Sequence, residues 1–334
     1  MSQRTITVAG AGIVGLWHAL LLARAGHRVR LVERSSEPFA RSASRYGGAM
    51  LAPWCETESA DAIVRDLGLR ALELWREAYP EARFDGSLVL AQSRDRKELT
   101  RFARLTEGHE AVDAEKLAKL EPDLEGRFTS GLFYPGEGHV QPESAMAYLL
   151  DAAREAGAEI QFGVALGNSS GELVIDCRGL DARDVLSGLR GVRGERVVVS
   201  TPEIRLNRPV RLLHPRFPIY VVPWGGGRFM IGATQIESEE AGPVTLRSAL
   251  ELLSTAYALH PAFGEAQIVE FGAGLRPSFP DNLPRIVVRS DHIYVNGLFR
   301  HGFLLAPALA ELTVAWVETG ARHPEVFVAD SSER

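Results

Sequence analysis

The sequence predicts an α/β (α+β) fold in which a discontinuous nucleotide-binding domain carries an inserted antiparallel/mixed-sheet domain. Two patterns support this prediction. A buried strand, a glycine-rich turn, a helix and a second strand follow one another within residues 5–33. Alternating strands and helices return in the middle and near the end of the chain, with closely spaced strands between them. The length of 334 residues fits about two domains.

The first unit comprises a strand at 5–9, a helix from 13 to about 25 and a strand at 28–33. Gly26 ends the helix. Helical periodicity follows over 59–78 and a strand over 87–91, and a charged, helix-like stretch spans 94–124. A strand at 131–134 precedes a helix over 142–157, which has proline at its start and glycine past its end.

The second half is richer in strands. They are expected at 158–162, 172–177, 192–200, 209–213, 218–223 and 228–234. The last three lie close together and suggest an antiparallel sheet. A helix over 245–259, a long strand over 266–276, a hairpin over 284–296 and an apolar helix over 301–320 complete the chain.

Composition excludes several classes of protein. The net charge of −6 argues against a nucleic-acid or anionic-membrane partner. The two cysteines, Cys55 and Cys177, exclude a disulfide framework and a cysteine-rich metal site, and we predict no metal. No apolar run approaches the ~20 residues of a membrane span, and no cleavage site follows the first apolar segment. We therefore expect a cytoplasmic protein.

The three lysines exclude two further chemistries. Lys97, Lys116 and Lys119 all lie in one polar, helix-like window. None has the spacing of a phosphate-binding P-loop. An exposed helix is also a poor place for the desolvated lysine that pyridoxal-phosphate chemistry needs.

The glycines of the first turn predict a dinucleotide site in a Rossmann-like domain. Gly10 permits the turn, Gly12 lets a pyrophosphate approach the backbone, and Gly15 lets helix and strand pack closely. The helix amino terminus stabilises phosphates, and Glu33, at the end of the second strand, can accept hydrogen bonds from ribose hydroxyls. FAD and NAD both fit this motif.

Three further segments distinguish these cofactors: 45–53 (RYGGAMLAP), 273–284 (AGLRPSFPDNLP) and 296–307 (NGLFRHGFLLAP). With 192–195 (VRGE), 220–223 (YVVP) and 231–234 (IGAT), they resemble the glycine oxidases of thiamin biosynthesis. These belong to the FAD-dependent family of D-amino-acid and sarcosine oxidases. The resemblance covers nearly the whole chain. It implies an FAD-binding domain at 1–82, 136–205 and 266–334 and a substrate-binding domain at 83–135 and 206–265.

The resemblance also implies the substrate site. Arg276 matches the arginine that holds the substrate carboxylate, a task suited to bidentate pairing. Tyr220 matches a tyrosine that contacts the same carboxylate, and Arg300 matches an arginine at the active-site end of the last strand. Residues expected to line the substrate pocket are Met50, Gln235 and His301.

FAD itself is expected to be noncovalent, because no cysteine occurs within 296–307. The amino end of the last helix can stabilise negative charge on the flavin. The residues expected to contact FAD are Gly10, Gly12, Ile13, Val14, Gly15, Glu33, Arg34, Gly47, Gly48, Met50, Gly179, Gly297, Arg300, His301, Gly302, Phe303 and Leu304.

The implied reaction is oxidation of glycine to its imine, with hydrogen peroxide released from dioxygen and the imine passed to thiazole synthase. Two positions depart from relatives: Pro218 replaces a histidine and Gln235 a methionine. Both alter the pocket wall, so oxidases of sarcosine, D-amino acids or N-carboxymethyl amines remain alternatives. An NAD-dependent dehydrogenase and a flavin-binding module without turnover are less favoured. The resemblance further suggests a homotetramer.

Overall fold

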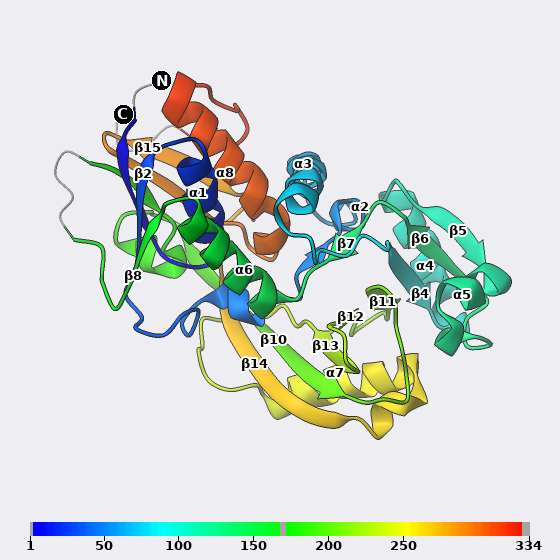
Figure 1. Ribbon diagram of the computed structural model, residues 1–334. Coiled ribbons are helices and arrows are strands. Elements are labelled where there is room, and N and C mark those ends of the chain that lie inside the picture. The colour runs from blue at the N-terminus through cyan, green and yellow to red at the C-terminus, as the bar shows by residue number, and fades with distance from the viewer. Residues whose placement is uncertain (1–2, 168–171, 329–334) are drawn as a thin grey trace.

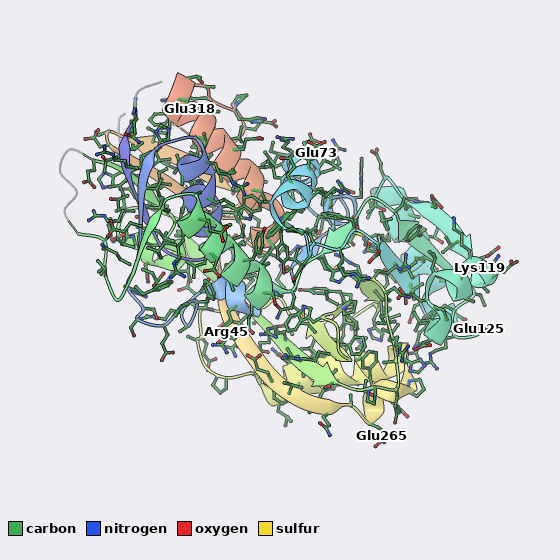
Figure 2. All side chains as sticks on the ribbon, viewed as in Figure 1. Arg45, Glu73, Lys119, Glu125, Glu265 and Glu318 are labelled. Carbon is green, nitrogen blue, oxygen red and sulfur yellow. The ribbon has the colours of Figure 1, made fainter. Side chains whose placement is uncertain are left out.

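The computed structural model describes residues 3–167 and 172–328. Two large sheets carry the fold, and both described ends of the chain lie beside the first of them (Figure 1). Charged side chains such as Lys119, Glu125 and Glu265 project from the periphery (Figure 2). The arrangement confirms the predicted mixed α/β fold.

The first sheet has seven strands in the order β17-β15-β16-β9-β1-β2-β8. Its strands pair in parallel except for the β15–β16 hairpin. Helices cover this sheet, so its central strands are apolar on both faces. The strands are β1 (Thr5–Ala9), β2 (Arg28–Glu33), β8 (Glu159–Phe162), β9 (Leu173–Asp176), β15 (Arg285–Arg289), β16 (His292–Asn296) and β17 (Phe327–Val328).

Four helices build the core beside this sheet: α1 (Ile13–Arg24), α3 (Ala62–Ala78), α6 (Pro142–Glu155) and α8 (Gly302–Thr319). Trp17 of α1 meets Trp75 of α3 edge-on, with ring centroids 4.9 Å apart. By length and composition alone α8 could cross a membrane, yet 56% of it is buried inside the structure. It packs against α1 and α3, as a core helix does.

The second sheet has eight strands in the order β14-β10-β13-β12-β11-β4-β6-β5. All neighbours are antiparallel except β4 and β11. The expected antiparallel arrangement of β11, β12 and β13 is thereby confirmed. The strands are β4 (Ser87–Ala91), β5 (Glu110–Asp113), β6 (Ser130–Tyr134), β10 (Arg190–Ser200), β11 (Val210–Leu213), β12 (Ile219–Pro223), β13 (Arg228–Gly232) and β14 (Gln267–Ser278).

The expected helical stretch over 94–124 is wrong in its middle. Helix α4 (Arg96–Leu105) ends before Gly108, whose φ of +73° does not belong to a right-handed helix. The chain then enters β5, which pairs with β6. Helix α5 (Ala114–Leu120) follows, and the Asp113 carboxylate caps it by accepting the N–H of Lys116.

Shorter elements complete the fold. Strands β3 (Met50–Leu51) and β7 (Gly138–His139) form a small ladder, which the sequence did not suggest. The remaining helical elements are α2 (Pro53–Glu56), α7 (Leu246–Leu259), η1 (Ala43–Tyr46), η2 (Ser93–Asp95), η3 (Pro122–Leu124), η4 (Gly179–Asp184) and η5 (Pro261–Gly264).

The predicted domain boundaries stay a prediction. Strands β10 and β14, placed by sequence in the FAD-binding part, belong to the second sheet. They are the two longest strands of the described residues, and they pair only within this second sheet (Figure 1).

Candidate active site

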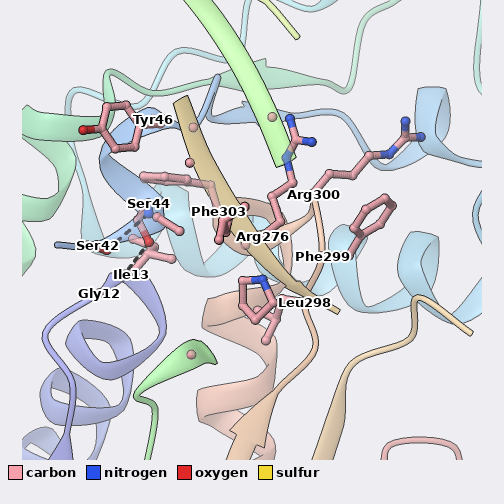
Figure 3. Close-up of a pocket in the computed structure, with 18 of the residues that line it drawn as sticks. Gly12, Ile13, Ser42, Ser44, Tyr46, Arg276, Leu298, Phe299, Arg300 and Phe303 are labelled. Atoms are coloured by element: carbon pink, nitrogen blue, oxygen red, sulfur yellow. Dashed lines mark hydrogen bonds between the residues drawn. The ribbon is translucent and has the colours of Figure 1, made fainter. Parts of the chain in front are cut away.

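A cavity of about 1030 Å³ lies where the two sheets meet. At one end it is lined by residues at or just past the carboxyl ends of β1, β2, β9 and β16, where open parallel sheets bind ligands. Gly12, Ile13, Ser42 and Ser44 lie toward this end, whereas Arg276 and Arg300 reach the other (Figure 3). We call them the nucleotide end and the substrate end.

Close backbone approach builds the nucleotide end. Gly10 has a φ of +97°, and a Cβ there would lie 2.7 Å from the carbonyl oxygen of Cys177. At Gly15 a Cβ would lie 1.8 Å from the carbonyl oxygen of Gly10. Gly15 therefore does not line the cavity. Its lack of a side chain lets helix α1 pack closely against the turn at Gly10. Helix α1 starts at Ile13, whose N–H donates to Ser44 Oγ at 3.2 Å.

Acidic groups follow at the end of β2 and after β9. The Glu33 carboxylate accepts the N–H of Ala11 and the N–H of Ser35, each at 2.9 Å. Arg34 forms an ion pair with Asp181 at 2.6 Å, and both line the cavity. Glu33 thus links the chain after β1 to the chain after β2 by hydrogen bonds, and it also lines the cavity.

Two glycines shape the middle of the cavity. A Cβ on Gly48 would lie 2.5 Å from the Tyr220 ring, and one on Gly47 would lie 3.0 Å from the Phe303 ring. Phe303 is in the first turn of α8, whose amino terminus also lines the cavity. A flat group could approach the backbone here, with a helix amino terminus to stabilise negative charge.

Arg276 on β14 dominates the substrate end. Its Nη1 donates to the Thr234 carbonyl oxygen at 3.0 Å. Within residues 3–167 and 172–328, no carboxylate lies at ion-pair distance from this guanidinium. Burial lowers its pKa, while Tyr220 is near enough to raise it and Arg300 lowers it. An arginine left without a counter-charge in a cavity suits a carboxylate ligand.

Arg300 is paired, in contrast to Arg276. Its Nη2 lies 2.5 Å from a Glu56 oxygen, and His301 Nε2 lies 2.9 Å from the same oxygen. Arg211 Nη2 contacts the other Glu56 oxygen at 3.0 Å. Burial raises the pKa of Glu56, but Arg300, His301 and Arg211 together hold it well below its ordinary value. Burial lowers the pKa of His301.

A second buried carboxylate lies behind this group. Glu137 accepts the N–H of Cys55 at 2.8 Å and the hydroxyl of Ser87. Burial raises its pKa to about 7. Burial also raises the pKa of Cys55 well above its ordinary value, which leaves this thiol protonated and unreactive.

Most of the residues predicted for the site line this one cavity; the exceptions are Gly15 and Gly297. A Cβ on Gly297 would lie 2.3 Å from the Phe279 ring, so this glycine is needed for packing. The roles assigned to the site residues stay predictions, as does the absence of a metal. Among the described residues no cluster of three metal-ligating side chains occurs.

Sequence reasoning missed several lining residues: Ser42, Ser44, Tyr46, Glu56, Asp181, Arg211 and Phe299. Ser44 directly precedes the segment 45–53, and a hydroxyl beside this glycine-containing stretch is the signal that points to it. Glu56 and Arg211 lie 155 residues apart in the chain, and no local pattern joins them.

The cavity fits a dinucleotide with a flat ring system. The Gly10–Gly12 turn and the start of α1 suit a pyrophosphate, Glu33 suits a ribose, and Gly47, Gly48 and the start of α8 suit a flavin. The family model for FAD dependent oxidoreductases matches residues 5–316. The chain belongs to this family. FAD as cofactor and the FAD-dependent oxidoreductase class are thereby confirmed.

Known relatives cover almost the whole chain. A ThiO protein of Rhizobium etli, whose name assigns it to thiamine biosynthesis, is 50% identical over 96% of this chain and 98% of its own. A glycine oxidase of Geobacillus kaustophilus is 27% identical over 94% and 92%. A bifunctional ThiO/ThiG protein of Synechocystis is 26% identical over 92% of this chain and 50% of its own. These relatives confirm the resemblance seen in the motifs.

The fold has solved counterparts. The crystal structure of a glycine oxidase from Bacillus cereus superimposes with a TM-score of 0.80 over 96% of both chains, at 23% identity. This likeness confirms the fold class.

Proposed function

We propose that the protein oxidises glycine to its imine and transfers the electrons to dioxygen, forming hydrogen peroxide. The imine either hydrolyses to glyoxylate and ammonia or supplies the thiazole moiety of thiamin. FAD, when bound, accepts the hydride from the substrate α-carbon and passes the electrons on to dioxygen.

One observation carries the proposal: the uncompensated guanidinium of Arg276 in the cavity. A substrate carboxylate would supply the missing counter-charge through two parallel hydrogen bonds. Tyr220, whose ring lies against Gly48, would add a third donor to the same group. Held in this way, a small amino acid would present its α-carbon to the middle of the cavity.

Arg300 has a different part in this proposal. Because Glu56 already pairs with it, we assign Arg300 to shaping the wall and balancing its charge. Glu56 also contacts Arg211 and His301, so its charge is already paired and it gives this wall no surplus negative charge.

The relatives support the same substrate class. The Geobacillus kaustophilus relative is named a glycine oxidase, and the Rhizobium etli relative is named for thiamine biosynthesis. The Synechocystis relative joins ThiO and ThiG in one chain, which supports the proposed hand-over of the imine to thiazole synthase. A homotetramer is proposed only from the family resemblance.

Purified protein tests the proposal directly. Flavin absorption bands should appear, and acid precipitation should release the colour to the supernatant if FAD is noncovalent. Oxygen consumption and peroxidase-coupled peroxide formation should then be followed with glycine, sarcosine, D-alanine and iminodiacetate. Glycine should give the highest kcat/KM. A higher kcat/KM for any of the other three amines would overturn glycine as the proposed substrate.

A further inference from the structure

The motif Arg193-Gly194-Glu195 on β10 has no place in the proposed chemistry, yet its backbone lies against the Arg276 guanidinium, whose Nη1 donates to the Arg193 carbonyl oxygen at 3.5 Å. A Cβ on Gly194 would lie 2.1 Å from Arg276 Nη2. The guanidinium therefore rests on the bare backbone of Gly194. Its Nη1 donates to the Thr234 carbonyl oxygen at 3.0 Å, so Thr234 sets the direction of the arginine.

The backbone of the same motif holds Thr234 in turn. The N–H of Thr234 donates to the Glu195 carbonyl oxygen at 3.1 Å, and the N–H of Glu195 donates to Thr234 Oγ1 at 2.9 Å. Arg193 and Ile236 exchange two backbone hydrogen bonds, each of 2.9 Å. The segment that carries the partner of Arg276 is thus an added strand-like edge on β10.

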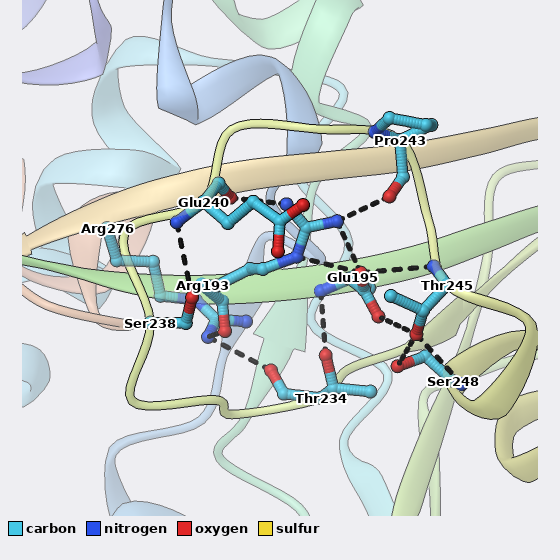
Figure 4. Close-up of polar contacts among 9 residues, drawn as sticks. All are labelled: Arg193, Glu195, Thr234, Ser238, Glu240, Pro243, Thr245, Ser248 and Arg276. Carbon is cyan, nitrogen blue, oxygen red and sulfur yellow. Dashed lines mark hydrogen bonds and ion pairs between the residues drawn. The ribbon is translucent and has the colours of Figure 1, made fainter.

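The side chains of Arg193 and Glu195 do not line the cavity, and they form a buried ion pair (Figure 4). Arg193 is 3% exposed and Glu195 is 0% exposed. Arg193 Nη2 lies 2.5 Å from Glu195 Oε1 and 2.5 Å from the Pro243 carbonyl oxygen, and Nη1 donates to the carbonyl oxygen of Glu240. Glu195 accepts the N–H of Thr245 at 3.3 Å.

These contacts fasten both ends of the segment 234–245. One end meets β10 through Thr234, and the other meets the Arg193–Glu195 pair through Glu240, Pro243 and Thr245, the cap of α7. Gln235 and Ala241, between these ends, line the cavity. A buried ion pair is a costly way to gain stability, because both charges lose their hydration. Its geometric demands are instead suited to holding a segment in one place.

We propose that the Arg193–Glu195 pair positions Arg276, which we call the carboxylate clamp. The pair fixes the segment 234–245, so that the Thr234 carbonyl oxygen directs the Arg276 guanidinium toward the substrate carboxylate. Neither residue contacts the cavity through its own side chain, so both are positioning residues. The inference rests on the proposed function, because it takes Arg276 to bind a carboxylate.

The chain offers a matched control in the Arg208–Glu121 pair. Glu121 is also 0% exposed, accepts Arg208 Nε at 2.8 Å and accepts the N–H of Asn207. Neither partner lines the cavity. Glu195→Gln and Glu121→Gln therefore each replace a buried carboxylate that pairs with an arginine, one tied to the clamp and one distant from it.

The test measures binding of glycolate, which has the glycine carboxylate and a hydroxyl in place of the amine, by calorimetry on the FAD-loaded protein. Glu195→Gln should weaken glycolate about tenfold, as the loss of a charged hydrogen-bond partner allows. Glu121→Gln should bind within about twofold of the parent while losing a similar amount of thermal stability. In turnover, Glu195→Gln should raise the KM for glycine and leave ethylamine oxidation, which needs no clamp, unchanged.

Parent-like glycolate binding in Glu195→Gln, or an equal loss in Glu121→Gln, would overturn the positioning role. Arg276→Ala separates the two proposals: if it binds glycolate like the parent, the clamp and the proposed function are both wrong. If Glu195→Gln does not fold, Thr245→Val removes the hydroxyl that donates to Glu195 Oε2 at 3.4 Å, and it should weaken glycolate about threefold. Unchanged affinity in that variant would likewise contradict the inference.

Discussion

The two ends of the cavity are built in opposite ways. At the nucleotide end, Glu33 has both carboxylate oxygens bound by the N–H groups of Ala11 and Ser35, close by in the first βαβ unit. At the substrate end, the charge of Arg276 is not met by any carboxylate of the described residues. The groups around it come from β10, β12 and β14 and from the segment after β13.

This difference reflects what each end must recognise. A dinucleotide is large and offers many contacts, so the protein can satisfy its own charges and bind through backbone and shape. A small amino acid offers few contacts, so one uncompensated cation must supply much of the binding free energy. A buried charge without a counter-charge destabilises the structure around it. In our proposal the Arg193–Glu195 pair supports Arg276 by holding the segment that orients it in one position.

The largest effect is expected when the uncompensated cation is removed. Arg276→Ala should lose ~2–5 kcal/mol of transition-state binding for glycine, or about thirtyfold to several thousandfold in kcat/KM. Arg276→Lys keeps the positive charge but lacks the two parallel N–H donors of a guanidinium. Its kcat/KM for glycine should lie between those of Arg276→Ala and the parent. Peroxide-coupled rates for glycine and ethylamine measure this. Equal losses for the two amines would mean that Arg276 supports the fold rather than the carboxylate.

The nucleotide end should respond through its cofactor. Glu33→Gln removes the charged acceptor expected to bind the ribose hydroxyls, and it should weaken FAD by roughly 1.5–3 kcal/mol, about ten- to a hundredfold. Titration of the apoprotein with FAD gives the affinity. Glu172→Gln is the control, because Glu172, directly before β9, accepts the hydroxyl of Thr7 on β1 and does not line the cavity. Equal FAD affinity in all three proteins would leave Glu33 with a packing role only.

Gly194→Ala should displace the clamp without removing it. The new methyl group would meet the Arg276 guanidinium at 2.1–2.6 Å, so the arginine must move. We expect about tenfold weaker glycolate binding, with FAD affinity preserved. Gly191→Ala, on the same strand, meets its nearest atom, Leu180 Cδ1, at 3.3 Å and should bind glycolate as the parent does. A crystal structure with Arg276 unmoved would contradict the expectation.

The smallest effect on ligand binding is expected at Glu137, behind the substrate end. Burial raises its pKa to about 7, so the folded state holds a proton that the unfolded state has already lost. The free energy of unfolding should therefore fall as pH rises from about 4.5 to 7, by roughly 3 kcal/mol, and stay level above that. Glu137→Gln should flatten this dependence in thermal denaturation. The same slope in parent and variant would show that Glu137 ionises normally.

The sequence by itself determined the parts of the molecule that depend on neighbours in the chain. The turn from Gly10 to Gly15, the end of β2 at Glu33 and the caps of the long helices follow from local backbone geometry. Motifs far apart could be joined only through their resemblance to a family, which brought Arg276 and Tyr220 to one site. Periodicity alone failed over 94–124, where β5 forms because β6 is available to pair with it.

Tertiary structure decided which charges are free and which are satisfied. Arg276 and Arg300 look alike in sequence, yet Glu56 pairs with one of them and leaves the other to a ligand. In sequence, Arg193 and Glu195 belong to an ordinary strand segment. Their special environment appears only in the tertiary structure, where Arg193 donates to the Pro243 carbonyl oxygen and Glu195 accepts the N–H of Thr245. Long-range contacts select among groups of the same chemistry, because the free energy of a charge depends on what surrounds it in space.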